Sequence, residues 1–293
     1  MKPPAFDYSR PDTLSAAVEL LDRYGHDGKV LAGGQSLIPL LSMRLMEPAR
    51  LIDINRLSEL AYLRTDPTGV RVGALARHAA VLRDSAAQAS QPLLAAALAF
   101  LAHPTIRNRG TTVGSIVHAD PAAELPAVLS LLGGSITAVS AAGRRIIPAA
   151  ELFRGPLESS LTESELAVEA FFPALGPLCG TGFAEVSRRR GDYAVCGVAA
   201  LVRLDEDLRI SSATAGYLSV ADTPLVLELT EPIAGRPFDA NLAPAAELAG
   251  SLVQPEADIH ASAQYRRQLV RVLTERVLGQ ACRTAAGLVE AAA

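Results

Sequence analysis

Hydrophobic and polar positions in residues 1–55 change period several times, which is typical of a small α/β unit. Apolar side chains recur every three or four residues from Leu14 to Leu21, which predicts an amphipathic helix that Asp12 or Thr13 can cap and Gly25 can end. Two short apolar runs flank a glycine pair and a second helical segment, and they predict strands that are parallel if that helix is a crossover. The expected elements are a helix at 14–24, a strand at 29–32, a helix at 36–43 and a strand at 49–54.

The pattern from residue 56 to residue 175 is that of antiparallel strands interrupted by helices. A turn sequence at 66–69 lies between alternating apolar positions, and Gly143 follows another alternating run, so both segments predict hairpins. The expected strands are 62–75 as a hairpin, 135–140 paired with 144–148, and 165–172; the expected helices are 77–88, 92–102 and 122–132. The segment at 105–126 starts with no clear helix or strand period, and its first part is expected to be a polar loop.

Pro173, Gly176, Pro177 and Gly180 mark the clearest boundary in the chain. After it, strands are expected at 182–188, 195–204 and 209–220, and amphipathic helices at 244–252 and 262–278. The predicted fold class is therefore mixed α+β. We expect one domain at 1–175, with subdomains at about 1–55 and 56–175, and a C-terminal domain at 176–293 built from an antiparallel sheet and helices.

Composition excludes several classes of protein. The apolar fraction of 49% supports packed cores, and a net charge of −4 leaves no basic surface for nucleic acid. The longest apolar run, Leu93 to Ala102, is too short to span a membrane, and the N-terminus lacks the apolar core of a signal peptide. Cysteines stand only at 179, 196 and 282, without spacing for a metal or cluster, and the histidines form no metal-binding motif. We expect a cytoplasmic protein with no metal site of its own.

Two glycine-containing loops are the strongest candidates for a binding site. Gly33 and Gly34 follow a predicted strand, and residues 109–115 are rich in glycine and hydroxyl side chains. Each loop taken alone is more often an ordinary connection. Two such loops in one α/β region can instead hold a pyrophosphate through backbone N–H groups, without a lysine. The lysines are Lys2 and Lys29, and neither follows a glycine loop, so a P-loop is excluded; no GxGxxG motif is present.

Three longer motifs resemble one known family. They are VLAGGQSLIPLLSMRL at 30–45, IRNRGTTVGSIVHADPAAELP at 106–126 and RRRGDYAVCGVAA at 188–200, with a weaker match in FDYSRPDTLSAAVELL at 6–21. In order and spacing they are similar to the FAD-binding medium subunit of the molybdenum hydroxylases, the group of carbon monoxide, nicotine, quinoline and xanthine dehydrogenases. The resemblance covers nearly the whole chain.

The resemblance implies a two-subdomain FAD-binding module of the vanillyl-alcohol-oxidase-like type, followed by a C-terminal antiparallel sheet with helices. It implies two pyrophosphate loops, a ribose carboxylate at Glu124, isoalloxazine contacts at Leu101 and Ala102, and an aromatic cover at Tyr193. Glu124 is also compatible with an exposed first-turn residue, and Tyr193 with ordinary packing. The FAD-binding residues carried over are Leu31, Ala32, Gly33, Gly34, Gln35, Ser36, Leu37, Ala102, Thr111, Gly114, Ser115, Glu124 and Tyr193.

One position departs from the family pattern. The second loop normally carries a glycine where this chain has Val113. A β-branched residue there is expected to hold φ negative and to crowd the pyrophosphate. We predict that FAD binding survives, because the first loop is intact.

The resemblance also implies a function. The chain would pass electrons from two-iron two-sulfur clusters of a small subunit through FAD to an external acceptor, while a large subunit holds molybdopterin. No catalytic acid or base in this chain is then required. Ala184 stands where NAD-reducing relatives carry a basic residue, which disfavours NAD as acceptor. The alternatives are a stand-alone FAD-dependent oxidoreductase without a molybdenum partner, and a scaffold that has lost FAD.

Overall fold

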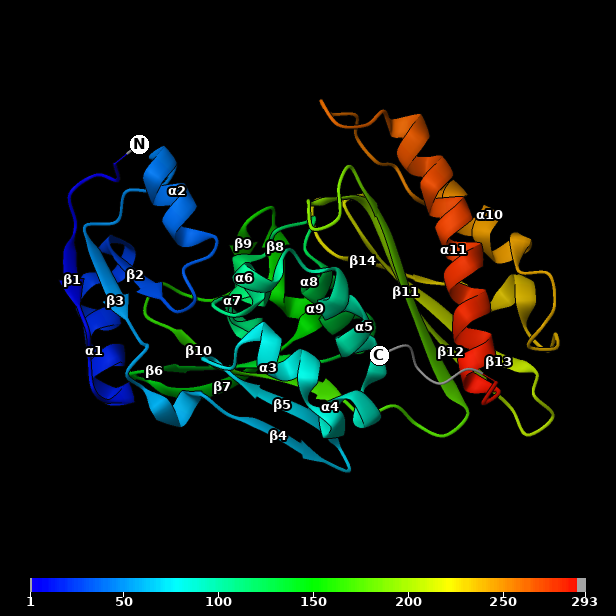
Figure 1. Cartoon of the computed structure of the whole chain (residues 1–293), viewed down its shortest axis with the longest axis horizontal. Helices are drawn as coiled ribbons and strands as arrows, with labels where there is room; N and C mark the ends of the chain where they lie inside the picture. Colours follow the sequence, from blue (N-terminus) through cyan, green and yellow to red (C-terminus); the bar gives the residue numbers. More distant parts are fainter. Residues whose placement is uncertain (1, 289–293) are drawn as a thin grey trace.

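A computed structural model describes residues 2–288. Figure 1 shows three blocks in a row: a small N-terminal unit, a central sheet with helices packed on it, and a C-terminal sheet against the long helix α11. The strands are β1 (Asp7–Ser9), β2 (Gly28–Leu31), β3 (Arg50–Asp53), β4 (Leu63–Asp66), β5 (Gly69–Gly73), β6 (Ser135–Ser140), β7 (Gly143–Pro148), β8 (Phe153–Gly155), β9 (Glu158–Ser159), β10 (Leu166–Pro173), β11 (Cys179–Ser187), β12 (Ala194–Leu204), β13 (Ile210–Leu218) and β14 (Leu225–Glu228). The helices are α1 (Leu14–Tyr24), α2 (Leu37–Met43), α3 (His78–Arg83), α4 (Ser85–Ser90), α5 (Pro92–Phe100), α6 (Pro104–Arg107), α7 (Thr112–His118), α8 (Glu124–Leu131), α9 (Ala149–Leu152), α10 (Ala243–Leu252) and α11 (Ala263–Ala285). The mixed α+β class is as predicted.

The N-terminal unit is a three-stranded parallel sheet in the order β1-β3-β2. Helix α2 connects β2 to β3, so the predicted crossover and its parallel strands are confirmed. Thr13 caps α1 by accepting a hydrogen bond from the N–H of Ala16 at 3.2 Å, and Gly25 ends it at φ 47°. This unit presents the loop between β2 and α2 to the central block.

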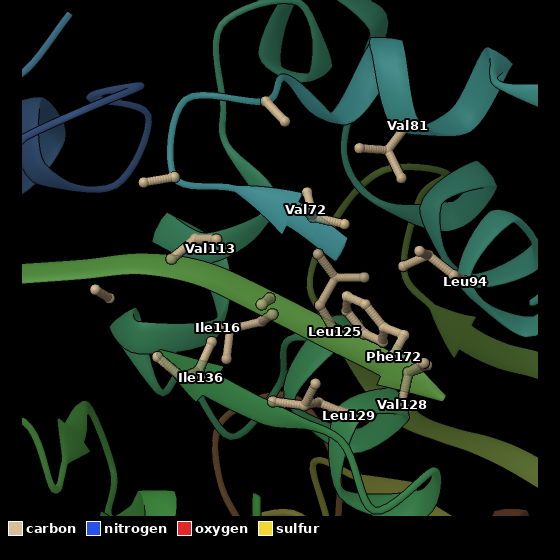
Figure 2. Close-up of a cluster of buried hydrophobic side chains, with 14 of the residues drawn as sticks. Val72, Val81, Leu94, Val113, Ile116, Leu125, Val128, Leu129, Ile136 and Phe172 are labelled. Carbon is tan, nitrogen blue, oxygen red and sulfur yellow. The ribbon is translucent and has the colours of Figure 1, made fainter. Parts of the chain in front are cut away.

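The central sheet has the order β4-β5-β10-β6-β7, with antiparallel neighbours throughout. Its apolar side chains meet those of α7 and α8 in the main core, where Val72, Ile116 and Phe172 lie together (Figure 2). These side chains are almost completely buried. The packing fixes the start of α7, which carries the second glycine loop, on top of the sheet.

The C-terminal sheet is an antiparallel meander, β11-β12-β13-β14. One face packs on α11, where the hydroxyl groups of Tyr217 and Thr274 lie 2.9 Å apart in the core. The opposite face packs on the central helices: the ring of Phe183 lies 5.3 Å from that of Phe100, centroid to centroid. The sheet is thus shared by two cores, which holds the β11–β12 loop near the end of α5.

Several predicted elements differ from the structure. The helix expected at 77–88 is two helices, because Asp84 caps α4 by accepting from the N–H of Ala87 at 2.8 Å. The polar loop expected before residue 122 contains α6 and α7. Strands β1 and β14 were not expected, and α11 extends to Ala285 rather than 278. The predicted domain division stays a prediction, and its last residues, 289–293, lie outside the described residues.

Within residues 2–288, no helix combines the length and apolarity needed to cross a membrane. Cys179, Cys196 and Cys282 are all free thiols, and the last two are fully buried.

Candidate functional site

A cavity of about 670 Å³ lies between the N-terminal unit and the central block. This volume is in the range of about 300–1,000 Å³ that is usual for cofactor sites. Every residue carried over from the resemblance lines the cavity except Leu31. The predicted residues that line it are Ala32, Gly33, Gly34, Gln35, Ser36, Leu37, Ala102, Thr111, Gly114, Ser115, Glu124 and Tyr193. Leu31 is the last residue of β2 and pairs with Asp53 of β3 instead.

The first loop, residues 32–36, joins β2 to α2 and touches the second loop directly. Gly34 has φ +73°, a conformation that side chains rarely adopt. A Cβ at Gly33 would lie 2.5 Å from the carbonyl oxygen of Arg109 and 2.8 Å from the Cα of Gly110. Within the described part of the chain, the side chain of Ser36 makes no capping hydrogen bond to α2. Gly33 is therefore a position where only glycine allows the two loops to meet.

The second loop, residues 109–115, leads into α7. Thr111 caps this helix by accepting from the N–H of Gly114 at 3.2 Å. His78 contacts this loop twice. Its backbone N–H donates to the carbonyl of Gly110 at 3.1 Å, and the Nδ1 of its imidazole lies 3.3 Å from the hydroxyl of Thr112. Burial, aided by the charges of Arg107 and Arg77, lowers the pKa of His78 to about 4. The imidazole is neutral near pH 7, so it serves as a hydrogen-bonding support.

Val113, the position that departs from the family pattern, lines the cavity. It lies in the first turn of α7, where a negative φ is required, and its side chain is 2% exposed. Figure 2 shows the side chain among the core residues, with Ile116 of the same helix. The expected negative φ is that of an ordinary helical residue, and crowding of the pyrophosphate by Val113 stays a prediction.

Carboxylates outnumber cations along the cavity. Among the described lining residues, Lys29 carries the one fixed positive charge. The acidic lining residues are Asp120, Glu124, Glu163, Glu165 and Asp192. An anionic ligand would therefore be held mainly by backbone N–H groups of the loops, which supply positive potential without a charged side chain.

Glu124 is the first residue of α8, and its carboxyl group faces the cavity. Burial, followed by the nearby carboxylate of Glu185, raises the pKa of Glu124 to about 8. Burial likewise raises the pKa of Glu185 to about 7, and its Oε2 atom has no hydrogen-bond partner among residues 2–288. Near pH 7, Glu124 is therefore mostly protonated when no ligand contacts it.

The other end of the cavity is formed by the end of α5 and the β11–β12 loop. Ala102 has φ +44°, and the guanidinium of Arg107 holds this turn by donating to the carbonyls of Leu101 at 2.7 Å and Ala102 at 3.0 Å. Gly191 packs against the imidazole of His103, because a Cβ at Gly191 would lie 2.6 Å from its Cε1. Tyr193 follows on the same loop and is 69% exposed at the cavity edge.

Sequence reasoning missed several lining residues. Lys29 and Val30 come from β2, and Leu161 and Leu166 come from the connection after β9 and from β10. Val30 opens the first family motif but was not carried over as a contact, whereas no local motif marks Lys29, Leu161 or Leu166, which reach the cavity through the pairing and packing of separate segments. His118 also lines the cavity, and burial lowers its pKa.

Two protein-family models match the chain. The FAD binding domain in molybdopterin dehydrogenase matches residues 4–175, and the CO dehydrogenase flavoprotein C-terminal domain matches residues 181–281. The 6-hydroxypseudooxynicotine dehydrogenase complex subunit alpha of Paenarthrobacter nicotinovorans is 43% identical over 96% of both chains. Quinoline 2-oxidoreductase from Pseudomonas putida 86 has a TM-score of 0.91 at 34% identity, over 97% of this chain and 99% of that one. Carbon monoxide dehydrogenase from Hydrogenophaga pseudoflava has a TM-score of 0.90 at 34% identity, over 96% and 98%.

Proposed function

The chain belongs to the family of FAD-binding medium subunits of molybdenum hydroxylases, and from this premise we propose how its residues hold FAD and which subunits it serves. The observation that carries the proposal is that the two glycine loops line the same cavity as Glu124, Ala102 and Tyr193, the residues predicted to contact the ribose and the isoalloxazine ring. The contact at Gly33 supports a fit, since it brings two stretches of backbone together in the way that a pyrophosphate site needs.

The two loops would bind the pyrophosphate. Loop residues 32–36 and 111–115 offer backbone N–H groups and hydroxyl side chains, and the lining supplies almost no cationic side chains. Some backbone N–H groups at the starts of α2 and α7 are already bonded, such as that of Ile38 to the carbonyl of Gly34 and that of Gly114 to the hydroxyl of Thr111; the others would donate to the pyrophosphate. A doubly charged pyrophosphate would replace the water at these donors, which favours binding despite the acidic lining.

The remaining predicted residues would hold the two ends of FAD. Glu124 would accept hydrogen bonds from ribose hydroxyl groups. Ala102, fixed by Arg107, would pack against the isoalloxazine ring, and Tyr193 would cover it from the C-terminal sheet. Once bound, FAD supplies the redox chemistry by accepting and releasing electrons. The protein orients the ring and limits the access of water and acceptor to it.

Membership of the family supports a finer proposal about partners. We propose that this chain works with a molybdopterin-binding large subunit and an iron-sulfur small subunit, and that it passes electrons from the clusters to an external acceptor. The cysteines are consistent with such a division, since all three are free thiols and lie apart from the cavity lining. Free thiols also suit a reducing compartment, and we propose the cytoplasm. A stand-alone flavoenzyme is not favoured.

Native purification tests this function. The chain is expected to carry about one FAD per polypeptide, and to bring down two further subunits that account for the molybdenum and iron. Absorbance, mass spectrometry of the released cofactor and metal analysis of each separated subunit make the measurement. Reduction of the flavin by substrate should require the complete complex. Absence of FAD, or full activity of this chain without molybdenum, would contradict the proposal.

Glu124 gives the site a predicted pH dependence. Hydrogen bonds from ribose favour the carboxylate, so the pKa of about 8 falls when FAD binds. The free site must therefore release a proton below pH 8, and the FAD dissociation constant is expected to decrease as pH rises, by up to about tenfold per unit between about pH 6 and 8. Titrations of the apoprotein by flavin fluorescence measure this slope.

Glu124→Gln should remove most of this slope, because the amide does not titrate. Glu151→Gln, an exposed carboxylate on α9 outside the lining, is the matched control and should keep it. A dissociation constant that is independent of pH in the unaltered protein would show that Glu124 does not bind as the carboxylate.

A further inference from the structure

Two side chains outside the cavity lining connect the two glycine loops. The Nδ2 of Asn55 donates to the carbonyl of Ala32, in the first loop, at 2.8 Å. The guanidinium of Arg77 donates through one nitrogen to the carbonyl of Arg109, in the second loop, at 2.6 Å. Its other terminal nitrogen donates to the Oδ1 of Asn55 at 2.6 Å. Ala32, Asn55, Arg77 and Arg109 thus form one continuous chain of hydrogen bonds between the two loops, which we call the loop tether.

The first half of the loop tether is anchored in the N-terminal sheet. Asp53 ends β3, is 7% exposed, and accepts from both the N–H of Asn55 at 2.9 Å and its Nδ2 at 2.6 Å. The hydroxyl of Tyr8 donates to the other carboxylate oxygen. Burial raises the pKa of Asp53, but these hydrogen bonds outweigh it and hold the pKa below its usual value. An ionised, nearly buried carboxylate thus fixes the orientation of the Asn55 amide.

The second half of the loop tether belongs to the central block. The backbone of Arg77 forms a β-bridge with Thr111, and the next residue, His78, donates its N–H to Gly110. Arg77 therefore holds the second loop both by its main chain and by its side chain. Because a guanidinium is planar and has several donors, it can contact Arg109 and Asn55 at the same time, which an ammonium cannot do in the same geometry.

The two loops come from different blocks, so nothing in either chain segment alone sets their separation. The close contact of Gly33 with Arg109 and Gly110 sets a minimum distance. The loop tether sets the maximum, because its hydrogen bonds break if the loops move apart. We propose that Asn55 and Arg77 are positioning residues that hold the two loops at the spacing of a pyrophosphate before FAD binds. This inference rests on the proposed FAD site, and it assigns neither residue a contact with FAD.

Dissociation of FAD from the full-length chain tests the loop tether. Asn55→Ala and Arg77→Met should each increase the FAD dissociation rate, measured as the recovery of free flavin fluorescence after dilution, by about 10- to 100-fold. The double variant should lose no more than the larger single effect, because both residues belong to one path. Arg56→Met is the matched control: Arg56 bonds only Asp12, at 2.9 Å, among the described side chains, and its variant should match the unaltered protein.

A probe that lacks the flavin ring separates positioning from general stability. ADP carries the pyrophosphate, so its dissociation constant should rise in each variant by the same factor as that of FAD. Arg77→Lys keeps the positive charge but loses the planar guanidinium that contacts two acceptors at once. It should weaken ADP binding nearly as much as Arg77→Met does, while leaving the apoprotein folded. If the variants lower the melting temperature but change FAD and ADP binding less than about twofold, or if their effects simply add, the positioning role is wrong. If the unaltered chain binds no FAD, the proposed function fails instead.

Discussion

Gly33→Ala is expected to weaken FAD binding strongly while leaving the chain folded. The added Cβ would lie 2.5 Å from the carbonyl oxygen of Arg109 and 2.8 Å from the Cα of Gly110, and both are backbone atoms that no side-chain rotation can move away. The loops must separate, which breaks the paired backbone site for the pyrophosphate. We expect affinity for FAD to fall by about 100-fold or more, as for the loss of several charge-assisted hydrogen bonds.

The measurement is FAD per chain after purification, from flavin absorbance, with circular dichroism to show that the fold persists. Gly155→Ala is the matched control in the same half of the molecule. Its new Cβ would meet only the Oε2 of Glu158, at 3.7 Å, which is an ordinary contact. A full complement of FAD in Gly33→Ala would mean that the loop contact is not part of the site.

Short-range patterns allowed most elements and both loops to be predicted. The β2–α2–β3 unit could be found because a change from strand to helix period and a glycine pair occur within a few residues. Helix α7 was missed because threonine and glycine fill its first turn, which resembles a loop. Its signal was nevertheless present: Thr111 stands three residues before Gly114 as a cap, and Val113 and Ile116 share a face.

The parts of the site that depend on tertiary structure could not be predicted in this way. Lys29 and Leu166 reach one cavity from segments more than a hundred residues apart. The loop tether is similar: Asn55 follows β3 and Arg77 precedes α3, and neither lies in a motif that names its partner. The family resemblance supplied residues that touch FAD, because those recur as motifs. The supporting hydrogen bonds appear only when the two blocks are seen together.

Gly180→Ala is expected to destabilise the C-terminal sheet far more than an ordinary surface substitution would. Strand β11 lies directly on α11, and a Cβ at Gly180 would lie 2.0 Å from the carbonyl oxygen of Ala281 and 2.3 Å from the backbone nitrogen of Ala285. The helix would have to move away, which would open the core that includes Tyr217 and Thr274. We expect a loss of about 3 to 5 kcal/mol in the free energy of unfolding, hence a melting temperature lower by roughly 10 °C.

Gly279→Ala is a control on the same helix with the opposite expected sign. Its Cβ would meet only a guanidinium nitrogen of Arg283 at 3.5 Å and the Cδ1 of Leu242 at 3.9 Å, and alanine is favoured over glycine inside a helix by up to about 1 kcal/mol. Two buried thiols report on this part of the molecule, since Cys196 lies in β12 and Cys282 in α11. Their labelling by a thiol reagent, followed across a urea series, should begin at lower urea in Gly180→Ala and at equal or higher urea in Gly279→Ala. Equal midpoints for the two variants would show that β11 and α11 can separate without loss of the core, and the C-terminal sheet could not then be the rigid support that holds Tyr193 at the cavity.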